Sequence, residues 1–127
     1  MSSFKRIKLN DGRSIPGIGF GTWRTGTGEA VVRQVDQAIN IGFDHVDTAQ
    51  AYGNERETGD ALYLSGVPRN DLWVTTKYSG RDPSLNIYES CKASLEKARI
   101  SELSLLTPHG RYSPALTSCN LSFSWNM

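Results

Sequence analysis

The chain has 127 residues, with 14 Lys and Arg against 13 Asp and Glu, and a formal net charge of +1. Hydrophobic residues make up 38% of it, which is typical of one ordinary folded domain and excludes an extensively disordered protein. Basic residues are interspersed with acidic ones, so no basic stripe indicates binding to nucleic acid or anionic lipid. No apolar run approaches the roughly 20 residues that a membrane-spanning helix needs.

The N-terminus and the cysteines favour a cytoplasmic protein. The first eight residues contain no apolar stretch of the kind found in secretion signals. Cys91 and Cys119 lie far apart, form no Cys-x-x-Cys motif and have no histidine cluster nearby. We therefore expect reduced thiols and no metal site.

The first part of the chain predicts a β-hairpin, a glycine-rich strand and a helix. Residues 7–9 and 14–15 flank a turn that contains Asp-Gly, a strong turn dipeptide. Residues 17–23 alternate glycine with larger side chains, which predicts a strand. Residues 29–41 carry apolar side chains at helical spacing, and Gly42 stands where a C-terminal cap belongs.

The middle of the chain repeats the strand–helix pattern. Residues 44–48 predict a strand, residues 55–65 a helix that ends before Gly66, and residues 72–76 a strand that ends in front of Lys77. Asp82 and Pro83 favour a third helix that begins there, because Asp is a preferred N-cap and Pro is tolerated in the first turn. A fourth strand is expected from about Leu103.

Strands that alternate with helices predict an α/β fold with a parallel sheet, either open and doubly wound or closed into a barrel. We assign this fold to residues 1–106. Residues 107–127 contain no Asp or Glu and no periodic pattern. They are interpreted either as a flexible tail or as sequence foreign to the fold, from a shifted frame or alternative splicing. The second interpretation is favoured because the break falls inside a strand.

Three chemically active side chains follow the predicted strands. Asp47 falls near the end of one strand, Tyr52 follows in the connecting loop, and Lys77 ends the next strand. Because the carboxyl ends of parallel strands meet at one edge of a sheet, these groups can share a site. A phenol beside an ammonium releases its proton more readily, so the set can protonate a carbonyl oxygen. Taken singly, each has an ordinary structural explanation: a loop tyrosine, a solvated strand end, and a capping or turn carboxylate.

Residues 42–55, Gly-Phe-Asp-His-Val-Asp-Thr-Ala-Gln-Ala-Tyr-Gly-Asn-Glu, resemble the first signature of the aldo-keto reductase family. Residues 19–23 resemble the family's opening strand on the cofactor side, and residues 75–77 its catalytic-lysine strand. The family forms a (β/α)8 TIM barrel. The resemblance therefore implies the N-terminal portion of one, a β-hairpin and about three and a half βα units, without a closed barrel.

The resemblance also implies a function: reduction of aldehydes or ketones to alcohols with NADPH, with NADH not excluded. It makes Tyr52 the general acid, Lys77 the neighbouring ammonium, and Asp47 the carboxylate that holds Lys77. Cofactor-binding residues would be Gly21, Thr22, Trp23 and Asp47, and substrate-binding residues would be Trp23 and Tyr52. For Trp23, a role as core filler is an equal alternative.

The chain also departs from the family pattern. Thr107 stands where the family has a catalytic histidine, and His109 follows two residues later, about 6.6 Å further along a strand. We expect His109 to be an exposed loop residue. Asn54 and Glu55 match family positions beside the site, although Asn54 is equally suited to cap the second helix.

We expect this chain by itself to be inactive. Half a barrel would leave inward apolar residues such as Ile18, Val46 and Val74 with nothing to pack against. The alternative to a reductase is a truncated, inactive isoform or frameshifted product that at most binds a partner protein. An unrelated dinucleotide-binding domain is not favoured, because the glycines at 17, 19 and 21 lack the required spacing and the helix that should follow.

Overall fold

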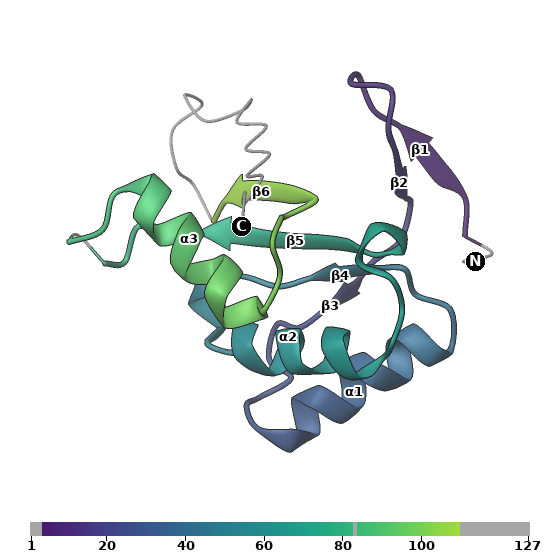
Figure 1. The fold of residues 1–127 in the computed structure, drawn as a ribbon, viewed down its shortest axis with the longest axis horizontal. Helices are drawn as coiled ribbons and strands as arrows, with labels where there is room; N and C mark the ends of the chain where they lie inside the picture. Colours follow the sequence, from purple (N-terminus) through teal and green to yellow (C-terminus); the bar gives the residue numbers. More distant parts are fainter. Residues whose placement is uncertain (1–3, 83, 110–127) are drawn as a thin grey trace.

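The computed structural model describes residues 4–82 and 84–109, which form a small hairpin and a parallel sheet with helices (Figure 1). The strands are β1 (Arg6–Lys8), β2 (Ser14–Pro16), β3 (Phe20–Gly21), β4 (His45–Asp47), β5 (Trp73–Tyr78) and β6 (Leu105–Pro108). The α-helices are α1 (Glu29–Asn40), α2 (Glu55–Leu64) and α3 (Ile87–Ala98), and the short 3-10 helices are η1 (Gln50–Tyr52) and η2 (Arg69–Asp71). In this part of the chain no helix is both long and apolar enough to cross a membrane.

The sheet order decides between the two predicted architectures. Strands β3, β4, β5 and β6 lie side by side in chain order, and every neighbouring pair is parallel. The helices α1 and α2 pack together along one side of the sheet, and α3 packs beside α2 (Figure 1). A doubly wound sheet would reverse its strand order and place helices on both faces. The architecture is therefore an open portion of a βα barrel.

The core lies between the sheet and its helices, which corrects one prediction. Val46 of β4 and Val74 of β5 are completely buried against apolar side chains of α1 and α2, including Val31 and Val35. They do not face the barrel interior, because strand side chains alternate between faces and the neighbouring odd-numbered residues take the other face. Of the three expected inward residues, only Ile18 is exposed. The apolar face of each βα unit is thus covered without a closed barrel.

Helix ends agree with the sequence for α1 and α2 but not for α3. α1 begins at Glu29 as predicted, and Gly42 follows it with a φ of +107°, a conformation that favours glycine. α3 begins at Ile87 rather than near Asp82. Asn86 and Glu89 form a reciprocal capping box, and the carboxylate of Asp82 instead accepts bonds from Ser84 in a preceding turn. A box that satisfies two backbone donors outcompetes a single Asp cap.

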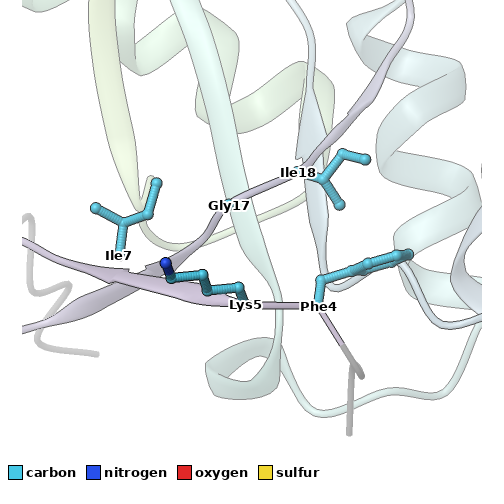
Figure 2. Close-up of a pocket in the computed structure, with 5 residues that line it drawn as sticks. All are labelled: Phe4, Lys5, Ile7, Gly17 and Ile18. Atoms are coloured by element: carbon cyan, nitrogen blue, oxygen red, sulfur yellow. The ribbon is translucent and has the colours of Figure 1, made fainter.

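The hairpin is placed as predicted, but the strand after it is shorter. Only Phe20 and Gly21 pair with β4, and the backbone N–H of Gly17 instead donates to Lys5 O beside the hairpin. Beside the hairpin lies an open, mostly apolar pocket of about 310 Å³ (Figure 2), lined by Phe4, Lys5, Ile7, Gly17 and Ile18. It lies on the N-terminal side of β3, away from the carboxyl strand ends where the sequence predicts the site.

β6 begins two residues later than expected and runs to Pro108, paired with β5 through Thr107 opposite Lys77. The strand therefore crosses the boundary drawn at residue 106. Residues 110–127 lie outside the described residues, and the interpretation of the tail stays a prediction.

Candidate active site

The structure brings Lys77 and Asp47 together at the carboxyl ends of β4 and β5. Asp47 pairs in register with Thr75, so Lys77 lies two residues further along β5 and its side chain turns back. Its ammonium donates to Asp47 Oδ1 at 2.6 Å and to the backbone oxygen of Thr48 at 3.0 Å. The Lys77 side chain is only 18% exposed and that of Asp47 34%, so the pair is partly shielded from water. The ammonium is held in one place.

Tyr52, the last residue of η1, lies against this ion pair. The ammonium of Lys77 is 5.0 Å from the centre of the Tyr52 ring, within range of a cation–π contact. The three predicted catalytic residues therefore meet, from a strand end, a short turn and the neighbouring strand. The charge of Lys77 thus lies over the ring that carries the phenolic hydroxyl.

Two more rings flank Tyr52. Trp23 lies on one side, with ring centres 5.0 Å apart, and the tryptophan is 55% exposed. Trp23 is therefore not core filler, and its role in lining the substrate pocket stays a prediction. On another side the ring of His109 meets Tyr52 edge to face at 5.6 Å.

His109 is therefore not the exposed loop residue that the sequence suggested. It follows β6 directly, its backbone N–H donates to Tyr78 O, and the side chain turns onto Tyr52. Its Nδ1 atom is buried and has no hydrogen-bond partner among the described residues. The distance along a strand did not predict the position of His109, because β6 ends at Pro108 and His109 no longer follows the strand direction.

Gln50, at the start of η1, fixes the turn that carries Tyr52, a role that no sequence motif indicated. Its amide oxygen accepts from the backbone N–H of Ser79, which follows β5. Its amide nitrogen donates to the hydroxyls of Ser90 and Ser94 on α3 at 2.9 and 3.0 Å. η1 is thus tied to β5 and to α3 by one side chain.

Asn54 and Glu55 hold the other end of the turn. Asn54 occupies the N-cap position of α2, but its side chain makes no capping bond and instead reaches the loop after β3. Glu55 is 3% exposed and accepts from the hydroxyl of Thr76 at 2.6 Å. The alternative in which Asn54 caps α2 through its side chain is wrong. A buried amide between two loops satisfies more polar groups than a cap would.

The predicted cofactor contacts differ in how accessible they are. Gly21 is exposed, and a side chain there would meet no atom within 4 Å. Trp23 and Asp47 also reach solvent. Thr22 is fully buried, and its hydroxyl is engaged with Thr48 and Asn54. Gly21, Trp23 and Asp47 are therefore accessible from solvent, whereas the Thr22 hydroxyl already has hydrogen-bond partners within the protein. That these four residues contact a cofactor stays a prediction. Within the described residues no cluster of His, Cys, Asp and Glu is able to hold a metal ion.

His45 lies on the same sheet face as Asp47 and shares a 2.9 Å hydrogen bond with the hydroxyl of Thr75. Burial lowers the pKa of His45, because the imidazolium is less well solvated inside the protein. The carboxylates of Asp47 and Asp44 oppose this effect, and the charge of Lys77 adds to it.

This shift predicts a pH-dependent stability. Below the ordinary histidine pKa of about 6.5, the unfolded chain takes up a proton that the folded chain resists, so stability is lost as the pH falls. We expect urea unfolding to show a smaller loss between about pH 7.5 and about pH 5 for His45→Gln than for the unchanged chain. Equal losses of unfolding free energy in the two proteins would show that His45 does not cause the pH dependence.

Comparisons with known proteins show the family of this chain. Residues 17–114 match the aldo/keto reductase family. An aldo-keto reductase of Mycolicibacterium smegmatis is 43% identical over 108 residues, which are 82% of this chain and 38% of that protein. The aldehyde reductase YPR1 of Saccharomyces cerevisiae is 43% identical over 94 residues, 72% of this chain and 30% of its own length.

Solved structures give the same result. The aldo/keto reductase from Brucella melitensis superimposes with a TM-score of 0.74 at 35% identity, over 86% of this chain and 42% of the other. The aldose reductase from Schistosoma japonicum gives 0.75, also at 35% identity, over 84% and 36%. The chain thus spans about two fifths or less of the length of these relatives. With the family match over residues 17–114 and four barrel-type parallel strands, this chain belongs to the aldo/keto reductase family.

Proposed function

We propose that this chain supplies the proton-donating half of an NADPH-dependent site that reduces aldehydes or ketones to alcohols. The observation that carries the proposal is the Lys77 ammonium, bonded to Asp47 and lying against the ring of Tyr52 at the carboxyl strand ends. Membership of a reductase family supports the oxidoreductase class.

Each residue has a distinct part in the reaction. Tyr52 gives its phenolic proton to the carbonyl oxygen as the carbonyl carbon gains a hydride, so that an alcohol forms. Lys77 stabilises the developing phenolate, and Asp47 keeps the ammonium in place. NADPH, when bound, supplies the hydride, and Gly21, Trp23 and Asp47 would hold it. Trp23 and Tyr52 line the position of the carbonyl substrate.

A chimera tests the proposal, because the chain spans only part of its relatives' length. In it, residues 17–106 of this chain replace the matching segment of the S. cerevisiae aldehyde reductase YPR1. We expect the folded chimera to oxidise NADPH in step with alcohol formation from a simple aldehyde, and to do so faster than with NADH. A chimera with native circular dichroism and no aldehyde reduction would overturn the proposal.

We propose further that the 127-residue chain alone does not turn over. In the described residues β3 and β6 each have one strand neighbour, and Thr107 stands at the end of β6 opposite Lys77. The test is an assay of the purified chain with NADPH and an aldehyde. Reduction that disappears in Tyr52→Phe would contradict this prediction. Co-purification of the chain with a full-length reductase would support the alternative function, in which an inactive isoform binds a partner protein.

A further inference from the structure

One buried amide connects the loop of Trp23 to the turn of Tyr52. Asn54 is 1% exposed, and its Nδ2 donates to the backbone oxygens of Thr22 and Gly26 at 2.9 and 3.1 Å. The same nitrogen lies 3.2 Å from the hydroxyl of Thr25. On its other side, Oδ1 accepts from the hydroxyls of Thr22 and Thr48 at 3.1 and 3.3 Å. The donors and acceptors of one side chain thus bind two segments, the loop after β3 and the end of β4.

The loop that Asn54 grips has an unusual backbone. Arg24 adopts a φ of +58°, in the left-handed region that non-glycine residues seldom enter, and Gly26 has a φ of +88°. The N–H and hydroxyl of Thr25 both bond back to Thr22 O, which tightens the turn around Trp23. Two carbonyl groups of this turn point at the Asn54 amide, so its N–H donors hold the turn in this shape.

Asn54 lies two residues after Tyr52, and the backbone oxygen that it binds belongs to Thr22, the residue before Trp23. Gly53, between Tyr52 and Asn54, has a φ of +71° and closes η1 through a bond to Gln50 O. Asn54 is therefore bonded to the loop that carries Trp23 and lies in the segment that carries Tyr52, whose rings are 5.0 Å apart.

We infer that Asn54 is a positioning residue that sets the spacing of the Trp23 and Tyr52 rings, and so the width of the carbonyl pocket. Its importance for catalysis rests on the proposed function, but the ring geometry does not. The donor side of the amide is decisive. The Asn54→Asp substitution keeps the size and the acceptors of the side chain but places a carboxylate against two carbonyl oxygens, with no N–H to donate.

The test uses the full chain labelled with 5-fluorotryptophan, with the fluorine resonances assigned by Trp→Phe variants. A Tyr52→Leu variant gives the Trp23 resonance without its ring neighbour. We expect Asn54→Asp to move the Trp23 resonance at least half of the way to that reference position and to leave the Trp73 resonance unchanged. Asn86→Asp, the same chemical change at the cap of α3, should move neither resonance.

Two outcomes would overturn the inference: a Trp23 resonance that stays in place in Asn54→Asp, or equal shifts of Trp23 and Trp73 in a folded protein. If Asn54→Asp fails to fold, Asn54→Ala decides, because it removes the same donors without adding charge. An unmoved Trp23 resonance in folded Asn54→Ala also refutes the role. No cofactor or carbonyl compound is present, so failure here leaves the proposed reduction standing, and an inactive chimera leaves the ring geometry standing.

Discussion

We expect Lys77→Met to lower carbonyl reduction by the chimera about 10²–10⁴-fold, the range by which positioned proton transfer accelerates reactions. Methionine retains much of the length and apolar character of the lysine side chain but removes the charge that lies over Tyr52. The phenolate that forms in the transition state then loses the cation that lies over its ring. Because this interaction strengthens as the proton leaves, kcat is expected to fall while the aldehyde KM changes little.

The matched control is Lys97→Met, the same substitution at an exposed position in the last turn of α3. It should leave kcat within about twofold of the unchanged chimera, because an exposed surface substitution away from the site perturbs the fold little. Steady-state kinetics at saturating NADPH measure both constants, and circular dichroism confirms that each variant is folded. A Lys77→Met chimera with undiminished kcat would show that the ammonium has no part in the reaction.

Gly59→Ala should destabilise the chain more than most single substitutions in its helices. A Cβ at Gly59 of α2 would overlap the carbonyl carbon and oxygen of Ala98 and lie 2.6 Å from its Cα. This neighbour is backbone at the end of α3 and has no flexible side chain to move aside. Alanine gains about 1 kcal/mol in helix propensity, but overpacking typically costs about 1–3 kcal/mol or more, and here the helices must separate.

We expect a net loss of about 2 kcal/mol in the free energy of unfolding, measured by urea denaturation. The control is Gly21→Ala, where a Cβ meets no atom within 4 Å, and its stability should change by less than about 0.5 kcal/mol. An equal or greater stability for Gly59→Ala would show that α2 and α3 pack less closely than described. The effect also bears on the site, because α3 carries the serines that bind Gln50.

The sequence correctly predicted that Asp47, Tyr52 and Lys77 lie close together, because their proximity follows from the order of the strands. Consecutive parallel strands bring their carboxyl ends to one edge, and each residue lay at or just after such an end. The same local patterns located α1 and α2 to within one residue at each end. Signals that act over a few residues were sufficient for these features.

Other features depended on contacts that no local pattern contains. The predicted start of α3 at Asp82 was wrong because Asn86, four residues later, forms a capping box with Glu89 that the sequence analysis did not consider. His109 was misplaced because the turn after β6, rather than strand spacing, directs its ring. Gln50 and Asn54 were not recognised as anchors because their partners lie up to 44 residues away. Val46 and Val74 were expected to point into the barrel, but the structure shows that they lie on the face that the helices cover.

The proposed function depends above all on the delivery of a proton from the Tyr52 hydroxyl to the carbonyl oxygen. Its most direct test is a single turnover of the chimera with an aldehyde and NADPH deuterated at the transferring carbon, in parallel for Tyr52→Phe and for Tyr63→Phe, an exposed tyrosine of α2. We predict deuterated alcohol at equal rates from the unchanged chimera and Tyr63→Phe, and a rate lower by at least about 100-fold from Tyr52→Phe. Deuterated alcohol formed by Tyr52→Phe at the unchanged rate would show that the Tyr52 hydroxyl does not deliver the proton.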